Sequence, residues 1–230
     1  MLFLHATRKL KLEKILYSVS VLKNIRLSAA TFLLTVERPD IEIKAGQCFN
    51  VGTCSAGVNR EYSMYSDANA NHVEFLIREV ENGIVSPPLA SLSAGDNCEL
   101  SGPYGEFCIE NAIDRGDKKF LFIGTGTGVA PFRSFVKTFP KIDFKIIHGV
   151  RYEEECYNSN EYSEHNYIPC ISRPSKTSSP QRVTDFIKKN PIDKNVTIYI
   201  CGNRKMVVDV FDICREQGIN GDNIFTEVFF

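Results

Sequence analysis

The chain has 230 residues, with 27 lysines and arginines against 28 aspartates and glutamates, and its formal net charge is −1. This balance argues against a nucleic-acid partner, because domains that bind nucleic acid usually carry a strong basic excess. The hydrophobic content of 43% and the charged content of 24% are typical of a folded protein of one or two domains, and the sequence has no apolar run of the roughly 18 residues that a membrane span needs.

Residues 1–14 are predicted to form an N-terminal arm. The apolar start before His5 is too short for the core of a signal peptide, and basic side chains follow it. Two interpretations of these charges stay open: an arm without a partner, or part of a docking surface for an acidic protein. The basic residues are Arg8, Lys9, Lys11 and Lys14.

Residues 15–113 are predicted to form an antiparallel β domain, either a barrel or a sandwich. Runs rich in β-branched and aromatic residues alternate there with turn residues, which is the pattern of short antiparallel strands. The predicted strands are residues 30–37, 47–52, 73–80 and 97–101, with a turn at residues 102–105.

Residues 114–230 follow a different pattern, in which strands alternate with helices. This alternation predicts a parallel sheet covered by helices on both faces, so we place the domain boundary after residue 113. The predicted strands are residues 120–124, 144–149, 167–172 and 196–201, and the predicted helices are residues 129–138, 183–189 and 205–217.

The stretch Gly124–Pro131 (GTGTGVAP) directly follows the first of these strands. Glycines that lead into a helix start present bare backbone N–H groups, and such a loop is suited to binding phosphates. The spacing is not the usual dinucleotide fingerprint G-x-G-x-x-G, which would need a glycine where Val129 stands. By itself the loop therefore predicts only a nucleotide phosphate site.

Ligands of open parallel sheets bind beyond the carboxyl ends of the strands. In this chain all four predicted strand ends carry small, polar or cationic residues, which strengthens the prediction of a nucleotide site. These ends are Gly124–Thr127, His148–Arg151, Ser172–Arg173 and Cys201–Gly202.

In the first half, Arg60-Glu61-Tyr62-Ser63 offers a guanidinium fork for a pyrophosphate, a ring that stacks on a flat heterocycle, and a hydroxyl for a ring nitrogen. Alone this motif is weak. Together with the other motifs it resembles the ferredoxin–NADP reductase family, and in particular the bacterial ferredoxin (flavodoxin) reductases. The other motifs, in chain order, are Gly83–Ser86, Gly102–Gly105, Gly124–Pro131, Cys201–Met206 and Glu227–Phe230, so the resemblance covers residues 28–230.

The resemblance implies an FAD-binding antiparallel β-barrel followed by an NADP-binding α/β domain. For FAD it implies Arg60 at the pyrophosphate, Tyr62 and Ser63 at the isoalloxazine ring, and the segment Ile84, Val85 and Ser86 at the phosphates. For the pyridine nucleotide it implies the loop Thr125, Gly126, Thr127 and Gly128 at the pyrophosphate and Cys201 beside the nicotinamide.

Residues near the end of the sequence receive roles from the same resemblance. Phe229 resembles the aromatic residue that covers the flavin and moves aside for nicotinamide, and Phe230 the one that lies on the FAD adenine side. Glu227 resembles a glutamate that assists proton or electron transfer in plant-type relatives, and a surface carboxylate is the alternative. For Cys201 the alternative is a small core hydrophobe.

Charge decides between NADP and NAD, because a 2′-phosphate needs cationic donors and a free ribose hydroxyl prefers a carboxylate. Asp143 precedes its strand and is badly placed as that carboxylate. Arg151, Ser172, Arg173 and Arg182 follow the strands and resemble the residues around the 2′-phosphate in NADP-specific relatives, so we expect NADP(H).

The eight cysteines include no C-x-x-C pair, and four histidines are available beside them, so we expect no zinc site. No C-x4-C-x2-C run predicts an iron–sulfur centre. Scattered free thiols favour a reducing compartment, and we expect a cytoplasmic protein.

The expected function is transfer of electrons between NADP(H) and a ferredoxin or flavodoxin that docks transiently through charge, by hydride transfer between nicotinamide C4 and flavin N5. We expect a monomer with no membrane contact. Open alternatives are an NADH-dependent reductase of an oxygenase component, a free flavin reductase, a component of a larger flavoprotein complex, and a non-catalytic flavin- or nucleotide-sensing module.

Overall fold

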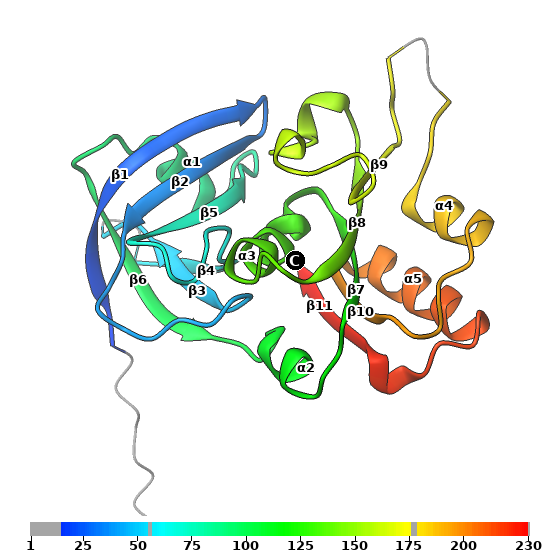
Figure 1. Ribbon diagram of the computed structural model, residues 1–230. Helices are drawn as coiled ribbons and strands as arrows, with labels where there is room; N and C mark the ends of the chain where they lie inside the picture. The colour runs from blue at the N-terminus through cyan, green and yellow to red at the C-terminus, as the bar shows by residue number, and fades with distance from the viewer. Residues whose placement is uncertain (1–14, 55–56, 176–178, 230) are drawn as a thin grey trace, which may run out of the picture.

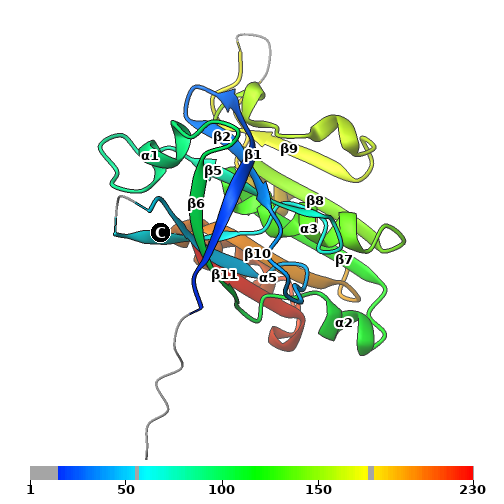
Figure 2. The same cartoon turned by 90° about the vertical axis from the view of Figure 1, so that its left-hand side faces the viewer.

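The computed structural model describes residues 15–54, 57–175 and 179–229, and the predicted arm 1–14 and Phe230 lie outside this part of the chain. The described residues form two sheets that lie side by side (Figure 1). In the view of Figure 2 the first sheet faces the reader and the second runs behind it. The two-domain fold predicted from the sequence is confirmed.

The first sheet is antiparallel, in the order β4-β3-β6-β1-β2-β5. A backbone bridge between Met64 and Phe75 joins its two edge strands and closes it into a barrel. Inside, Phe49 and Phe75 meet edge to face at 5.9 Å. The strands are β1 (Tyr17–Ser28), β2 (Thr31–Glu37), β3 (Cys48–Gly52), β4 (Asn59–Ser63), β5 (His72–Arg78) and β6 (Asn97–Tyr104).

The predicted turn at residues 102–105 is wrong, because β6 continues through Gly102 and Pro103 to Tyr104. The register between β3 and β6 shifts at this place, between the pairs Cys48–Tyr104 and Asn50–Ser101. Proline cannot donate a ladder hydrogen bond, so it is tolerated in a strand where the pairing is interrupted.

The second sheet is parallel, in the order β11-β10-β7-β8-β9. The helix α3 (Ala130–Thr138) lies on the face towards the barrel, whereas α4 (Val183–Lys189) and α5 (Arg204–Glu216) cover the other face (Figure 1). The strands are β7 (Lys119–Thr125), β8 (Asp143–Val150), β9 (Tyr167–Ile171), β10 (Thr197–Asn203) and β11 (Ile224–Phe229).

The two domains share one hydrophobic core. A single buried cluster runs from the barrel through α3 to one face of the parallel sheet, and its aromatic rings include Phe122 stacked on Phe132 at 5.1 Å. A second cluster fills the space between the other face of the sheet and α4 and α5. The short helices α1 (Ser86–Ala90) and α2 (Glu110–Asp114) were not predicted, and the predicted boundary falls inside α2.

An ion-pair network also joins the domains. Arg133 of α3 donates Nη1 to the Tyr65 carbonyl at 3.0 Å and to Glu74 of the barrel at 3.1 Å. Its other two nitrogens bind both carboxylate oxygens of Glu161, at 3.1 and 3.0 Å. The arginine side chain is only 12% exposed. The bidentate pair with Glu161 fixes the guanidinium within the second domain, and the bonds from Nη1 to Glu74 and to the Tyr65 carbonyl hold α3 against the barrel.

Candidate functional site

The order of strands in the parallel sheet locates the site. The chain builds β7, β8 and β9 in one direction and then returns to place β10 and β11 on the other side of β7. Strand order therefore reverses between β7 and β10. A crevice for ligands opens at such a switch point, outside the carboxyl ends of the two strands. Here those ends are Thr125 and Asn203.

The loop after β7 is built for close packing. Gly126–Val129 forms a single 3-10 turn that leads into α3. A side chain at Gly128 would place its Cβ 2.6 Å from the carbonyl oxygen of Cys201, so only glycine lets the loop approach the end of β10. At Gly126, by contrast, φ is +55° and a Cβ would meet nothing within 4 Å.

This loop fits a phosphate ligand. Thr125 precedes the helical turn, and its side chain does not cap the turn. Its hydroxyl instead accepts a hydrogen bond from the Asn203 N–H at 3.4 Å. The first N–H groups of a helix have no intrahelical partner, so an uncapped turn with open space beside Gly126 leaves these donors for an anion.

Three predicted residues from both domains meet at the switch point. Ser63, at the end of β4, donates its hydroxyl to Glu227 Oε2 of β11 at 3.1 Å. The thiol of Cys201, at the end of β10, approaches the same oxygen at 3.7 Å. Ser63 and Cys201 are buried. We call these three residues the junction cluster.

Burial sets the protonation of the junction cluster. It raises the pKa of the Glu227 carboxyl, against the lowering effect of the hydrogen bonds from Ser63 and Cys201. Burial and the neighbouring Glu227 raise the pKa of Cys201 well above its ordinary value, so this residue is a neutral thiol. Burial, followed by Glu227, also raises the pKa of Cys48 to about 12.

The remaining predicted flavin residues line the barrel. Arg60 is exposed and donates Nη1 to the Asn59 carbonyl at 3.0 Å. Tyr62 is half-buried, and burial raises its pKa to about 12. Strand alternation places these two side chains on one face of β4 and Ser63 on the other. An exposed guanidinium beside a half-buried ring fits a dinucleotide that lies along β4.

The segment Ile84–Ser86 lies at the start of α1. Ile84 is 66% exposed, whereas Val85 and Ser86 are buried. The Ser86 hydroxyl accepts a hydrogen bond from the Val80 N–H at 2.9 Å, which leaves its own proton for another acceptor. The hydrogen bonds of the described residues do not join this segment to β4, so a bound ligand would have to connect them.

The predicted 2′-phosphate residues form an exposed edge at β8 and β9. The Arg173 N–H donates to the Arg151 carbonyl at 2.8 Å, and the Ser172 hydroxyl donates to the Val150 carbonyl at 3.2 Å. Arg182 stands at the N-cap position of α4. It lies close to β9, because the N–H of its neighbour Gln181 donates to the Ile171 carbonyl. We call Arg151, Ser172, Arg173 and Arg182 the arginine edge.

The sequence analysis missed two carboxylates at the arginine edge. Glu155 accepts a hydrogen bond from the Arg151 N–H at 2.7 Å, and Glu153 accepts one from the Ser175 N–H at 2.9 Å. The Ser175 N–H is the first cause of the lowered pKa of Glu153. The acidic run directly after Arg151 was the available signal.

Phe229 ends β11 opposite Asn203 and packs half-buried against the shared core, near the domain junction.

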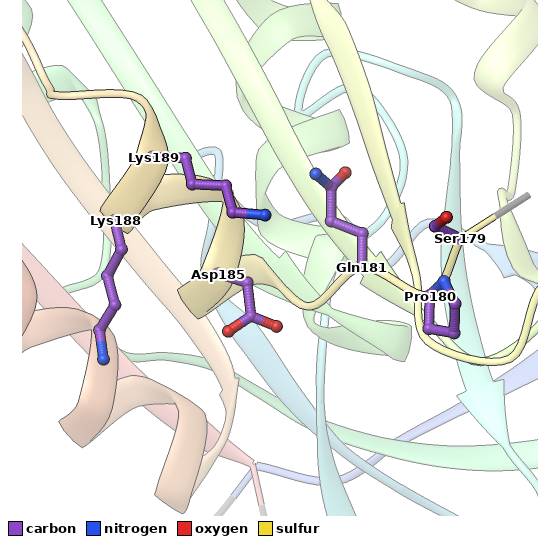
Figure 3. Close-up of a pocket in the computed structure, with 6 residues that line it drawn as sticks. All are labelled: Ser179, Pro180, Gln181, Asp185, Lys188 and Lys189. Carbon is purple, nitrogen blue, oxygen red and sulfur yellow. The ribbon is translucent and has the colours of Figure 1, made fainter.

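The pocket in Figure 3 lies outside all these groups. Asp185, Lys188 and Lys189 line it from α4, and none of the predicted site residues does.

Further observations concern other classes of site. Within the described residues, no group of three or more histidine, cysteine, aspartate or glutamate side chains is placed to hold a metal ion. The helices of this part of the chain are all too short or too polar to cross a membrane. All eight cysteines are free thiols.

Two family models define the class of this protein, the two-domain flavin- and pyridine-nucleotide-dependent oxidoreductases. Residues 17–109 match the oxidoreductase FAD-binding domain, and residues 122–212 match the oxidoreductase NAD-binding domain. The chain belongs to the ferredoxin–NADP reductase family, and its cofactors are FAD and a pyridine nucleotide.

Among curated proteins, the chain is 28% identical to the toluate 1,2-dioxygenase electron transfer component of Pseudomonas putida, over 91% of this chain and 67% of that protein. It is 26% identical to the propane 2-monooxygenase reductase component of Rhodococcus jostii, over 86% of this chain and 58% of that one. The chain thus spans only part of these relatives.

Solved structures share the fold. A ferredoxin NADP+ reductase from Neisseria gonorrhoeae, with bound FAD and NADP, superposes with a TM-score of 0.82 at 24% identity, over 95% of this chain and all of that chain. A cytochrome P450 reductase from Amycolatopsis also reaches 0.82, at 22% identity, over 94% of this chain and 71% of that one.

Proposed function

We propose that this protein moves electrons between NADP(H) and a ferredoxin or flavodoxin. The observation that carries the proposal is the junction cluster, in which Ser63 of the barrel bonds Glu227 of the parallel sheet at 3.1 Å. A flavin on the barrel and a nicotinamide on the sheet would meet at this place. FAD, when bound, supplies hydride acceptance and release of single electrons, and the protein supplies orientation.

Each residue of the junction has a task under this proposal. Glu227 has a raised pKa and accepts hydrogen bonds from Ser63 and Cys201 at Oε2, so it is suited to holding a proton on its other carboxyl oxygen beside the flavin. Cys201 presents a neutral thiol that brings no charge to the nicotinamide. Phe229 covers the site and excludes water between turnovers.

The arginine edge supports NADP(H). A backbone hydrogen bond joins Arg173 to Arg151, so the two side chains branch from neighbouring backbone positions at the end of the sheet. Two arginines match the cationic donors that a 2′-phosphate needs. We also propose that the protein acts as a cytoplasmic monomer, and its eight free thiols suit a reducing compartment.

A second candidate is an NADH-dependent reductase of an oxygenase component. It is supported by Glu153 and Glu155, whose carboxylates lie at the arginine edge where a ribose diol would need an acceptor. The names of the toluate dioxygenase and propane monooxygenase relatives support it as well.

An anaerobic titration separates the candidates. The full chain is loaded with FAD, and bleaching of the flavin absorbance is followed with NADPH and NADH in parallel. We expect NADPH to be preferred by at least about tenfold, because a charged 2′-phosphate contact is worth roughly 1.5–3 kcal/mol. Equal or better reduction by NADH would overturn the NADP assignment in favour of the second candidate.

The carrier is tested in the same preparation. The reduced protein is mixed with a ferredoxin or a flavodoxin, and carrier reduction is followed by its own absorbance. We expect transfer that slows as salt is added, because transient docking through charge is screened.

A protein that stays colourless with added FAD would instead support the sensing module.

A further inference from the structure

His148 is a buried titratable group that the proposed reaction does not use. It lies near the carboxyl end of β8 and its side chain is fully buried. Its Nε2 lies 2.8 Å from the Gly126 carbonyl oxygen, in the loop after β7. Its Nδ1 lies 2.7 Å from the Tyr167 hydroxyl on β9. The imidazole thus connects the loop after β7 to the edge strand β9.

The chemistry of these contacts fixes the tautomer. A carbonyl oxygen only accepts hydrogen bonds, so the proton of the ring is on Nε2 and is donated to Gly126. Burial lowers the pKa of His148 to about 4, although the bond to Gly126 opposes this, and the ring is neutral at pH 7. Nδ1 is therefore an acceptor, and the Tyr167 hydroxyl donates to it.

The bond to His148, together with the 3-10 turn that begins at Gly126, sets which way the next peptide N–H points. In a planar trans peptide the carbonyl of one residue and the N–H of the next point in opposite directions. With the Gly126 carbonyl turned towards His148, the Thr127 N–H points away from the protein interior, and the space beside Gly126 is open. Glycine adopts several backbone conformations at little cost, so residue 126 does not fix this orientation by itself.

We propose that His148 is a positioning residue for coenzyme binding: it holds the Gly126 carbonyl inward so that the Thr127 N–H faces the pyridine-nucleotide pyrophosphate. The proposal rests on the assignment of Thr125–Gly128 as the pyrophosphate site. Without this bond the 126–127 peptide populates orientations that turn a carbonyl dipole towards the phosphate. His148 therefore acts on coenzyme affinity and leaves the hydride-transfer step unchanged.

The matched substitutions His148→Gln and His148→Asn test the proposal. The side-chain amide nitrogen of glutamine reaches the position of Nε2, whereas that of asparagine reaches only the position of Nδ1. We expect His148→Gln to keep the NADPH dissociation constant within about twofold. We expect His148→Asn to raise it about tenfold, which corresponds to one net hydrogen bond.

The measurement is anaerobic stopped-flow reduction of the FAD-loaded full chain over a series of NADPH concentrations. It separates the dissociation constant from the limiting rate of flavin reduction, and we expect only the first to change. A general loss of packing would move the limiting rate, the FAD content and the melting temperature together, and glutamine would not rescue it.

Two more variants keep the result decisive. If His148→Asn does not fold, Tyr167→Phe still removes the hydrogen bond to Nδ1 that holds the ring in place, and we expect a two- to threefold rise in the NADPH dissociation constant. Gly126→Ala tests the loop itself, because φ is +55° there and alanine is strained in that conformation.

The outcomes are distinct. The positioning role is overturned if His148→Asn binds NADPH with wild-type affinity while Gly126→Ala binds it weakly. If His148→Asn is unfolded, Tyr167→Phe takes its place in this comparison. Unchanged affinity in Gly126→Ala overturns the assignment of the pyrophosphate loop, and with it that part of the proposed function.

Discussion

The junction cluster and the arginine edge both include residues of the parallel sheet but are built in opposite ways. Ser63 and Cys201 are buried and bond one carboxylate, so this region is ordered by contacts within the protein. At the arginine edge the backbones of Arg151 and Arg173 are paired, but their side chains are exposed. Under the proposed function, the geometry of the reacting centre is set by contacts within the protein before a ligand binds, whereas the choice of coenzyme depends on solvated charge.

This difference has a measurable consequence. Buried contacts are little affected by salt, whereas exposed charges are screened within a Debye length of about 8 Å at physiological ionic strength. Substitutions at the junction should change rates at any salt concentration. Substitutions at the arginine edge should change the affinity for NADPH, and this change should become smaller as salt is added.

The largest effect is expected from Gly128→Ala, which acts on the buried region. The added Cβ would lie 2.6 Å from the Cys201 carbonyl oxygen, so the loop must move away from the junction. We expect kcat/KM to fall about 100-fold, since misplacement by about 1 Å has effects of this size. Gly221→Ala is the control, because its nearest contact is an ordinary 3.5 Å to Arg215. Equal activity of the two variants would show that the loop adapts without cost.

The next effect concerns the ion-pair network between the domains. Arg133→Gln leaves Glu161 and Glu74 without their largely buried partner, and we expect the free energy of unfolding to fall by about 2–3 kcal/mol. The control is Arg26→Gln, which breaks the exposed pair with Glu79 and should cost less than about 1 kcal/mol. Chemical denaturation measures both. If Arg133→Gln is no worse than Arg26→Gln, the network does not hold the domains together.

The same network predicts a pH dependence. Burial raises the pKa of Glu161, but hydrogen bonds from Arg133 and Lys137 outweigh it and lower the pKa to about 2. A carboxyl with a lowered pKa stabilises the fold above its unfolded value of 4.5 and loses this contribution as the pH falls towards 2. In Arg133→Gln we expect a shallower loss of stability between these pH values, measured by unfolding at a series of pH values.

Glu227→Gln should have a smaller effect, on rate and stability in opposite directions. We expect the rate of electron transfer to the carrier to fall about tenfold, because glutamine keeps an acceptor for Ser63 but cannot exchange a proton with the site. In the wild-type protein the pKa of the Glu227 carboxyl is raised. Ionisation of this group therefore destabilises the fold at pH values above its unfolded pKa of 4.5. The variant should therefore melt about 2–4 °C higher at pH 8, with the difference vanishing near pH 4.5. A rate change equal to that in Glu61→Gln, an exposed neighbour, would contradict the role.

The sequence predicted most of the parallel sheet because its strands are long apolar runs. The predicted strand 120–124 lies within β7, the predicted strand 196–201 overlaps β10 from Thr197 onwards, and the helix at 183–189 has the observed bounds. Strand β1 was not predicted, because its polar residues, such as Lys23 and Asn24, hide the alternation. Strand β11 was read only as a motif, since its side chains are mostly half-buried.

The site was predictable where a motif carries it and not where distant contacts create it. Ser63, Cys201 and Glu227 were each chosen from local patterns, but the bond between Ser63 and Glu227 joins residues 164 positions apart. The position of Arg133 between Tyr65, Glu74 and Glu161 had no local signal. These contacts depend on how the barrel packs against α3, which no single segment encodes.

The smallest effect, and the sharpest test of the contrast, is expected from Arg173→Ala at the arginine edge. Its guanidinium is exposed and, among the described residues, donates only to the Tyr152 hydroxyl at 3.3 Å, so its loss leaves the fold intact. We expect the KM for NADPH to rise about fivefold at low salt with kcat unchanged, and the KM for NADH to stay the same, because only NADPH carries the 2′-phosphate. The increase should shrink at high salt. Glu153→Gln is the opposite control: removing a negative charge from the same edge should lower the KM for NADPH. An equal change for both coenzymes in Arg173→Ala would mean that this edge binds a part common to both, and the 2′-phosphate assignment would be lost.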